Sequence, residues 1–252
     1  MSTDTTAVAA REPELLGQIV VAIGGSAGIG LETARRARAE GAEVILTGRN
    51  AERLERAAAE IGARGTAAFD ATDPAALDRF FDGLPAQIDH VMVTGPGPYY
   101  APLAELDRDQ ALRAFDDHQW LAVAVAQHAV GRVRPGGTLV FMGGTGGRRP
   151  GIGLGIVPTV TAALPALTAS LALELAPVRV NLIAAGFVDT PLSAALLGDE
   201  LDARRAALRA TLPIGRVVGP ADVAALAVHL MTNTAVTGAT YDIDGGQQLV
   251  EA

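Results

Sequence analysis

The chain contains no cysteine among its 252 residues, which excludes disulfide bonds, thiolate metal sites and a cysteine nucleophile. Aromatic residues make up only 4% of the chain, and just three of them are tyrosines. Acidic residues outnumber basic ones, and the net charge of −8 would repel a phosphate backbone. Nucleic acid is therefore a poor candidate partner, and we predict no metal site.

The composition is otherwise that of a folded chain with a large core. Hydrophobic residues make up 49% and charged residues 19%, and the length suits one α/β domain. The first ten residues include Asp4 but no basic residue and no sustained apolar run, so we expect no signal peptide. Together with the absence of cysteine, this pattern is compatible with a cytoplasmic location, which we expect.

One apolar stretch, residues 152–175, is long enough to resemble a membrane span. Glycines and prolines interrupt it, and threonine and serine recur within it, so a buried helix in a soluble core explains it better than a membrane span. Pro165 lies inside this helix, where proline costs about 3 kcal/mol or more. We therefore expect a kink or a local break at Pro165.

Short apolar runs alternate with segments of helical periodicity along the rest of the chain. Strands are expected at 18–23, 43–47, 66–69, 90–93, 138–142, 178–183 and 240–243. Helices are expected at 29–40, 51–61, 74–81, 107–133, 158–175, 193–210 and 221–231. This alternation predicts an α/β fold with a doubly wound parallel sheet of about seven strands and helices on both faces. Residues 1–16 form a predicted flexible arm, and 17–252 a single domain with a mobile substrate lid around 187–212.

A glycine-rich segment, Gly24-Gly25-Ser26-Ala27-Gly28-Ile29-Gly30, lies between the first strand and the first helix. Glycines at this point permit a tight turn and a close approach of the backbone to a pyrophosphate, which the start of the helix then binds. A glycine-rich turn alone is weak evidence, but its place in an alternating chain makes it specific for a Rossmann-type dinucleotide site. Gly24, Ser26, Ala27, Gly28, Ile29 and Gly30 are the candidate contacts.

The end of the second strand carries the signal for the type of cofactor. Chains that prefer NAD commonly place an acidic residue near this point, whereas here Gly48 is followed by Arg49. A guanidinium suits the 2′-phosphate of NADP, so we predict NADP(H) rather than NAD; the alternative is an ordinary surface arginine. Asp70 follows the third strand, where it could bind the adenine.

With these residues established, nearly the whole chain resembles the short-chain dehydrogenase/reductase family. The glycine motif carries the resemblance, together with the turn at 94–97, the segment 171–181, the segment 186–191 and the Asp-Gly-Gly sequence at 244–246. The resemblance implies that Thr94 and Gly95 border the cofactor. It also implies that the segment from Gly186, through the backbone near Val188 and the hydroxyl of Thr190, holds the nicotinamide carboxamide.

The same resemblance fails at the positions that carry the family's chemistry. Family members use a Tyr-x-x-x-Lys pair, a serine at the end of the preceding strand and an asparagine in the helix before it. Alignment without an insertion places Val157 and Thr161 at the tyrosine and lysine positions, Gly144 at the serine position and His118 on or near the asparagine position. All four expected catalytic side chains are therefore absent by this alignment.

Five side chains are candidate replacements. His118 carries an imidazole, a group that can act as a proton donor, although it could also face solvent or cap a helix. Tyr99 and Tyr100 follow the turn at 94–97 and could bind a substrate oxygen or form a pocket wall. Thr145 and Thr161 carry hydroxyls near the vacated positions, with local backbone bonding as the alternative. Arg148 and Arg149 could bind an acidic group, but a solvated pair is the simpler interpretation.

Two functions follow from this pattern. The first is an atypical NADP(H)-dependent oxidoreductase that reduces a small apolar aldehyde or ketone with a non-standard proton donor. The second is a catalytically inactive NADP(H)-binding sensor or partner subunit, and non-redox chemistry on the same scaffold is a weaker third. The resemblance also implies a homotetramer or homodimer formed through the helices at 107–133 and 158–175. We expect a small-molecule substrate and no membrane partner.

Overall fold

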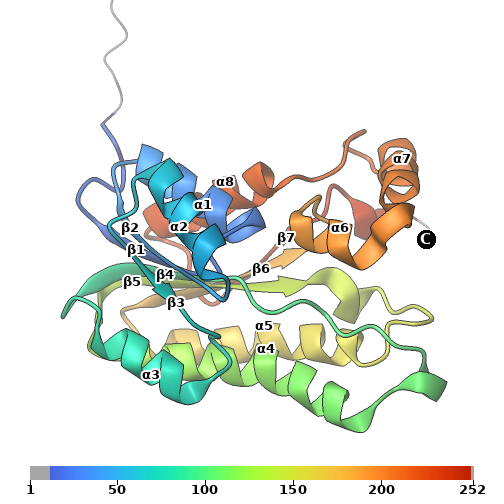
Figure 1. Ribbon diagram of the computed structural model, residues 1–252, viewed down its shortest axis with the longest axis horizontal. Coiled ribbons are helices and arrows are strands. Elements are labelled where there is room, and N and C mark those ends of the chain that lie inside the picture. Colours follow the sequence, from blue (N-terminus) through green and yellow to red (C-terminus); the bar gives the residue numbers. More distant parts are fainter. Residues whose placement is uncertain (1–11, 251–252) are drawn as a thin grey trace, which may run out of the picture.

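The computed structural model describes residues 12–250, which form a three-layer α/β sandwich around one parallel sheet (Figure 1). The sheet has seven strands in the order β3-β2-β1-β4-β5-β6-β7, and every neighbouring pair is parallel. The strands are β1 Ile19–Ile23, β2 Glu43–Gly48, β3 Gly65–Ala68, β4 Ile88–Val93, β5 Val133–Gly144, β6 Arg179–Ala185 and β7 Thr240–Ile243. The predicted doubly wound sheet is confirmed.

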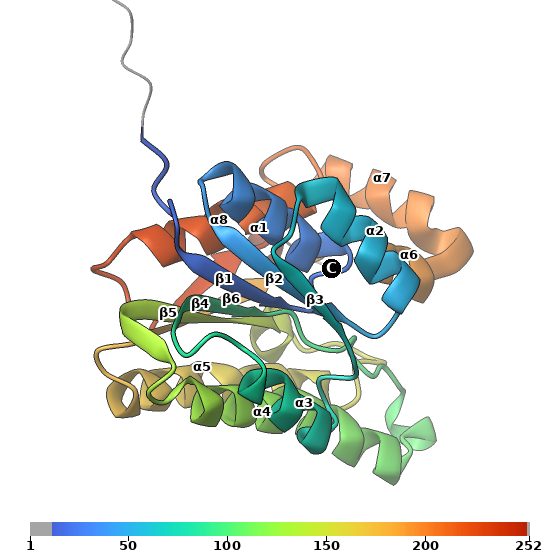
Figure 2. The ribbon, with the colours of Figure 1, turned by 60° about the vertical axis from the view of Figure 1, so that its left-hand side comes forward.

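Helices cover both faces of the sheet (Figure 2). On one face lie α1 Gly28–Ala39, α2 Ala51–Ile61 and α8 Pro220–Thr232. On the other lie α3 Pro74–Asp82, α4 Arg108–Ala129 and α5 Val157–Glu174. Each face encloses its own apolar cluster, because strands buried on both sides are apolar at nearly every position, as the fully buried β1 is.

The connections complete the architecture at the carboxyl end of the sheet. Short 3₁₀ turns lie at η1 Leu103–Glu105, η2 Thr145–Arg148, η3 Gly198–Glu200 and η4 Gln247–Leu249, and the remaining helices are α6 Pro191–Leu197 and α7 Leu201–Thr211. From β1 the chain winds outward to β3 and then crosses to β4, so the strand order reverses between β1 and β4. In open α/β sheets ligands bind at such a reversal, beyond the carboxyl ends of the strands.

Two helix predictions were wrong in their extent. Helix α4 ends at Ala129 rather than at 133, because Gly131 has a φ of +71° and Val133 already pairs with Ile88 of β4. The predicted lid helix 193–210 is two helices, α6 and α7, separated by η3. Gly198 ends α6 with a φ of +50°, a conformation that other residues rarely adopt.

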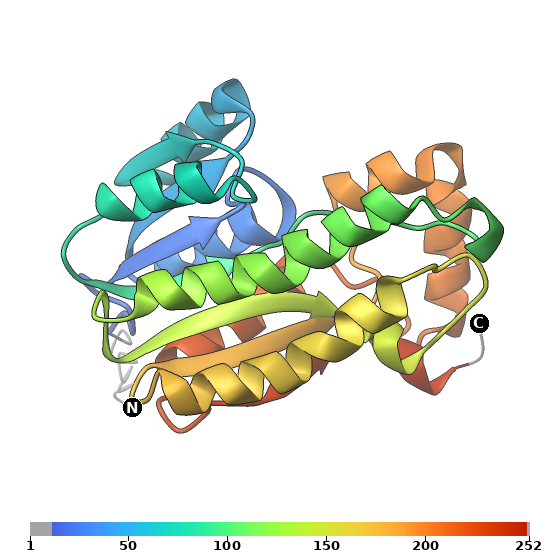
Figure 3. The same ribbon diagram turned by 90° about the horizontal axis from the view of Figure 1, so that it is seen from below.

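Helix α5 corrects two further predictions. It continues through Pro165 without a break, so the predicted local break is wrong. Its length and composition would suffice to cross a membrane, as those of core helices can, but only 28% of its residues are buried within the chain. The helix is therefore only partly buried in a single copy, whereas the sequence predicted a buried core helix. Figure 3 shows α4 and α5 side by side under the sheet, with their outer faces uncovered.

The predicted N-terminal arm lies largely outside the described residues, which begin at residue 12. At its end the prediction is wrong. Leu15 is fully buried, and its N–H donates to the carbonyl oxygen of Glu40 at 2.9 Å. This contact attaches the chain to the end of α1 before β1 begins.

Candidate functional site

The glycine-rich turn after β1 is fixed by packing against the end of β4. Gly24 has a φ of +84°, and a Cβ atom there would lie 2.2 Å from the Thr94 Oγ1. A Cβ on Gly30 would lie 2.4 Å from the Gly24 carbonyl oxygen. The Thr94 hydroxyl donates to the Ile23 carbonyl at 2.9 Å, which joins the ends of β1 and β4. Side chains are therefore excluded at Gly24 and Gly30 by contacts inside the protein.

Helix α1 begins without a side chain that satisfies its first amides. Its N-cap residue, Ala27, makes no capping hydrogen bond, and its first turn contains no acidic residue. Helices α2, α3 and α4 are capped by Asn50, Asp73 and Asp107 instead. The free amides and the positive end of the helix dipole make the start of α1 suitable for an anion such as a pyrophosphate. Ile29, in this first turn, packs on the core beneath it.

The end of β2 offers a cation beside the glycine-rich turn. A Cβ on Gly48 would lie 2.8 Å from the Oγ of the buried Ser26, so the two segments are in close contact. Arg49 follows directly, is exposed, and makes no hydrogen bond or ion pair within the described residues. Asp70 is also exposed, and its carboxylate accepts from the N–H and hydroxyl of Thr72 at 3.1 and 2.8 Å. One oxygen of Asp70 thus stabilises its own turn.

The segment 186–190, which follows β6, lies across from the glycine-rich turn. A Cβ on Gly28 would lie 3.6 Å from the side chain of Thr190, which also caps α6 by accepting from the Ser193 N–H at 3.2 Å. Val188 is buried and forms a bridge with Val218. A Cβ on Gly186 would lie 2.6 Å from Asp244, so only glycine fits there. The glycine-rich turn and the segment 186–190 therefore lie against each other at the carboxyl end of the sheet.

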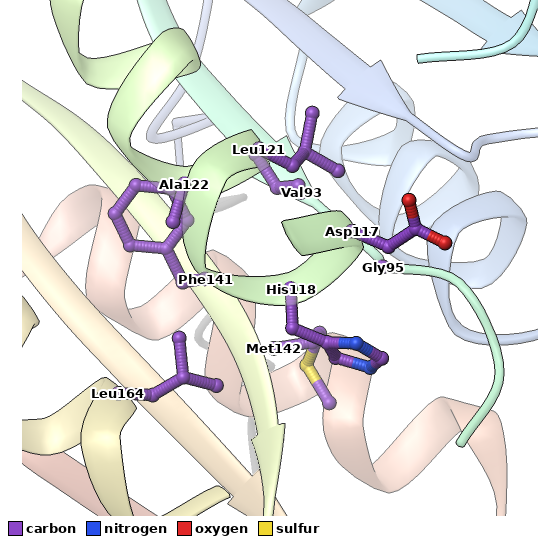
Figure 4. A pocket seen from close by; sticks show the side chains of 9 residues that line it. All are labelled: Val93, Gly95, Asp117, His118, Leu121, Ala122, Phe141, Met142 and Leu164. Atoms are coloured by element: carbon purple, nitrogen blue, oxygen red, sulfur yellow. The ribbon is translucent and has the colours of Figure 1, made fainter. Parts of the chain in front are cut away.

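His118 lines a small pocket between α4 and the ends of β4 and β5 (Figure 4). Its Nδ1 lies 2.7 Å from the carbonyl oxygen of Ala114. Because a carbonyl oxygen can only accept, Nδ1 carries a hydrogen and Nε2 is left for another partner. A Cβ on Gly95 would lie 3.9 Å from the ring, and Figure 4 shows the imidazole beside Met142. The pocket is lined by Val93, Gly95, Asp117, His118, Leu121, Ala122, Phe141, Met142 and Leu164.

Asp117 is a second titratable group in this pocket, and the sequence prediction missed it. Burial raises the pKa of its carboxyl, and the negative charges of Asp70 and Asp116 act in the same direction, while His118 and Arg113 oppose them. The sequence feature that could have indicated Asp117 is its position directly before His118, in a helix whose family counterpart borders the active site. A carboxyl with a raised pKa in a pocket is a functional candidate in its own right.

The positions vacated by the family's catalytic side chains lie together. A Cβ on Gly144 would lie 3.3 Å from the Thr161 Cγ2, and one on Gly146 would lie 3.4 Å from both the Thr161 Oγ1 and the Val157 Cγ1. The Thr161 hydroxyl donates to the Val157 carbonyl at 2.9 Å, so it is available only as an acceptor. Thr145 is buried next to them. The full sequence contains no lysine at all, so no other lysine can substitute.

The two tyrosines lie further out, on the loop after β4. The hydroxyl of Tyr99 accepts from the Asp107 N–H at 3.1 Å and so helps to form the start of α4. Tyr100 is 50% exposed; partial burial raises the pKa of its phenol, and the charge of Arg204 in α7 opposes this. Neither tyrosine lines the pocket of His118.

The interpretation of Arg148 and Arg149 as a solvated pair is incomplete, because both guanidiniums have partners within the chain. Arg148 forms a two-pronged ion pair with Asp242, and Arg149 donates to the carbonyl of Gln247. Both arginines therefore attach the turn after β5 to the C-terminal segment.

A doubly wound sheet with an uncapped helix start and a glycine-rich turn at its switch point defines the class of Rossmann-type nucleotide-binding proteins. Within that class, the family described as enoyl-(acyl carrier protein) reductase matches residues 24–248. The chain belongs to the short-chain dehydrogenase/reductase family.

The relatives are oxidoreductases that match along nearly their whole length. The short-chain dehydrogenase/reductase ATR9 of Stachybotrys chlorohalonatus is 30% identical over 93% of this chain and 98% of its own. The 3-oxoacyl-[acyl-carrier-protein] reductase FabG of Salmonella typhimurium is 28% identical over the same shares. Among solved structures, MalC reductase/Diels-Alderase of Malbranchea aurantiaca superposes with a TM-score of 0.85 at 25% identity, covering 94% of this chain and 99% of that one. A small-chain dehydrogenase in complex with NADPH superposes with a TM-score of 0.79 at 28% identity, over 92% and 99%.

Proposed function

We propose that this chain is an NADP(H)-dependent oxidoreductase that reduces a small apolar aldehyde or ketone, with His118 as the proton donor. The observation that carries the proposal is the imidazole of His118, held by the Ala114 carbonyl at 2.7 Å in a pocket beside the switch point. Its Nε2 has no hydrogen-bond partner in the described part of the chain, and the family alignment places a residue of the active site at or near this position.

The residues around the glycine-rich turn fit a dinucleotide. The uncapped start of α1 at Gly28 would hold the pyrophosphate, and Arg49, which has no polar partner in the described part of the chain, would hold the 2′-phosphate. We assign Asp70 to the adenine, and Val188 and Thr190, of which Thr190 lies beside Gly28, to the nicotinamide carboxamide. When bound, the cofactor supplies a hydride. A superposed relative is an NADPH complex, which supports this choice of cofactor.

Reduction of a carbonyl also requires one proton at the oxygen, and this is the part that the chain itself must supply. In its protonated form His118 donates from Nε2 to the developing alkoxide, while Nδ1 keeps its hydrogen bond to Ala114 throughout. The ring therefore needs no reorientation between its two protonation states, and solvent returns the proton. Asp117, whose pKa is raised by burial, lies next to His118 as a source of protons.

A second candidate, an inactive NADP(H)-binding sensor or partner subunit, is favoured by one observation. The positions of the missing pair are filled by Val157, which is buried, and by Thr161, whose hydroxyl donates within its own helix. These side chains cannot transfer a proton or supply a positive charge.

For either candidate we propose a homodimer or homotetramer. Leu112, Phe115 and Trp120 of α4 and Leu173 of α5 are 40–82% exposed on the outer face of the helix pair. Because an apolar face of this kind is normally covered, a second copy is the natural occupant. Trp120→Asp should lower the molar mass measured by light scattering, whereas Val130→Asp at the far end of α4 should not. A wild-type chain that is a monomer at micromolar concentration contradicts the proposal.

The function is tested by NADPH oxidation against a panel of carbonyl compounds. The same samples report NADPH binding by fluorescence. His118→Asn, which keeps the size of the side chain without a titratable proton, should reduce turnover by about 100-fold or more and leave the dissociation constant of NADPH unchanged. His229→Asn is the matched control, because His229 is exposed on α8, outside the pocket. Equal turnover in wild type and His118→Asn would exclude His118 as donor. NADPH binding without turnover by the wild type on any compound favours the second candidate.

A further inference from the structure

Two helices of the lid are held with few apolar contacts. None of the residues of α6 is buried, and in α7 only Leu208 is. Leu192 and Leu196 of α6 are 47% and 48% exposed. In contrast, α8 buries six residues against the sheet. Helices α6 and α7 therefore depend on polar contacts for their position more than the other helices do.

Arg205 of α7 makes the most specific of these contacts. Its Nε lies 2.9 Å from the Asp189 Oδ2, and its Nη2 lies 2.8 Å from the Asp189 Oδ1, which is a two-pronged pair. The remaining Nη1 lies 2.9 Å from the Asp202 Oδ1 and so fixes the guanidinium to its own helix. The side chains of Arg205 and Asp189 are each about 30% exposed, so the pair is partly shielded from water.

Asp189 lies between the two residues proposed to hold the nicotinamide, Val188 and Thr190. Its own N–H donates to the Val218 carbonyl at 2.9 Å. On its other side, Thr190 begins α6 as the N-cap. A change in the position of the Asp189 carboxylate therefore acts on the backbone of its two neighbours, Val188 and Thr190. The other end of the segment is attached to the C-terminal region, because the Phe187 N–H donates to the Gln247 Oε1 at 2.8 Å.

We infer that Arg205 is a positioning residue. It couples the lid helices α6 and α7 to the segment 186–190, which we propose binds the nicotinamide end of the cofactor. This inference rests on the proposed function. When α7 is in place, the guanidinium fork holds Asp189, and with it Val188 and Thr190, in the binding geometry. When α7 moves away, the carboxylate of Asp189 loses the guanidinium, and the segment keeps only its backbone contacts to Gln247 and Val218. Because coupling is reciprocal, a bound cofactor must also stabilise the lid.

The test is the dissociation rate of NADPH from the full chain, followed by stopped-flow fluorescence. Arg205→Met should raise this rate by about ten-fold, within the usual range for coupling between sites. Arg205→Lys keeps the charge but loses the fork, so it should restore only part of the difference. Arg209→Met is the matched control, because Arg209 lies on the same helix, is exposed and has no polar partner in the described part of the chain. The melting temperatures of all variants should remain close to that of the wild type.

A double-mutant cycle and hydrogen exchange separate coupling from a merely structural effect. Asp189→Asn should raise the dissociation rate as Arg205→Met does, and the double variant should add little further. NADPH should protect the amides of 191–211 from exchange in the wild type but not in Arg205→Met. Equal dissociation rates for Arg205→Met and Arg209→Met, or additive effects in the cycle, would overturn the inference. A wild type that does not bind NADPH would instead refute the proposed function, which is a different result.

Discussion

The residues proposed to bind the cofactor and those proposed for catalysis differ in what they are made of. The proposed cofactor half of the site consists mainly of backbone: glycines at 24 and 30, uncapped amides at the start of α1, and main-chain groups near Val188. The catalytic half depends on side chains, and at 144, 157 and 161 the expected ones are absent. A Cβ at Gly24 or Gly30 would lie less than 2.5 Å from another atom, whereas a Cβ on Gly144 would lie 3.3 Å from the Thr161 Cγ2, a tight contact that a shift of a few tenths of an ångström relieves. Packing thus constrains the first half far more than the second.

A carboxylate placed at the start of α1 is expected to have the largest effect on cofactor binding. Gly28→Asp should weaken NADPH binding by at least about 100-fold, because the charge opposes a pyrophosphate where the helix dipole should attract it. A Cβ there meets nothing closer than 3.6 Å, although the φ of +55° adds strain. Gly153→Asp is the matched control, with a φ of +81°, open surroundings and a place outside the cofactor half. Equal NADPH titrations for the two variants would contradict the assignment.

Arg49 is the side chain of the proposed cofactor half that should select between NADPH and NADH. Arg49→Ala should weaken NADPH binding by about 10- to 100-fold and leave NADH binding unchanged, since only NADPH carries the 2′-phosphate. Arg53→Ala serves as control, because Arg53 is also exposed and lies one turn further along α2. Parallel losses for NADPH and NADH after Arg49→Ala would show that the residue acts on the fold instead.

The buried His90 in β4 makes the stability of the folded chain depend on pH. Burial, and then the charge of Arg179, lower the pKa of its imidazole to about 3. The folded chain therefore keeps His90 neutral while the unfolded chain protonates it below about 6.5, so stability falls as the pH drops from about 6.5 towards 3. His90→Gln should reduce this slope by up to about 1.4 kcal/mol per pH unit. Urea denaturation between pH 7 and 4.5 measures this pH dependence of the free energy of unfolding. An unchanged slope in His90→Gln would refute the role of His90.

Much of the fold could be predicted from the sequence because its signals are local. Apolar runs, turn glycines and proline at helix starts predicted the strands and most helices. The prediction failed where distant contacts decide the outcome: Val133 continues an apolar helical pattern, but pairing with Ile88 makes it a strand residue. The apolarity of α5 was interpreted as burial within the chain, although the sheet covers only one of its faces.

For the site, the sequence could predict the residues of the glycine-rich turn but not the long-range pairs. Arg148 meets Asp242 across 94 positions, and Arg205 meets Asp189 across 16. Nothing in the spacing of these residues distinguishes them from solvated charges, because an ion pair between separate elements depends on the folded geometry. The hydrogen bond from His118 Nδ1 to Ala114 is local, but it depends on the orientation of the ring, which the spacing of the residues does not give.

The most direct test of the comparison is a titration of the wild-type chain with NADPH and with NADH, followed by nicotinamide fluorescence. If the residues proposed to bind the cofactor are intact without the family's tyrosine and lysine, the chain should bind NADPH saturably. It should bind NADPH about ten-fold or more tightly than NADH because of Arg49. Absence of saturable NADPH binding would contradict the account, because it would show that the backbone of the glycine-rich turn does not suffice to form the site.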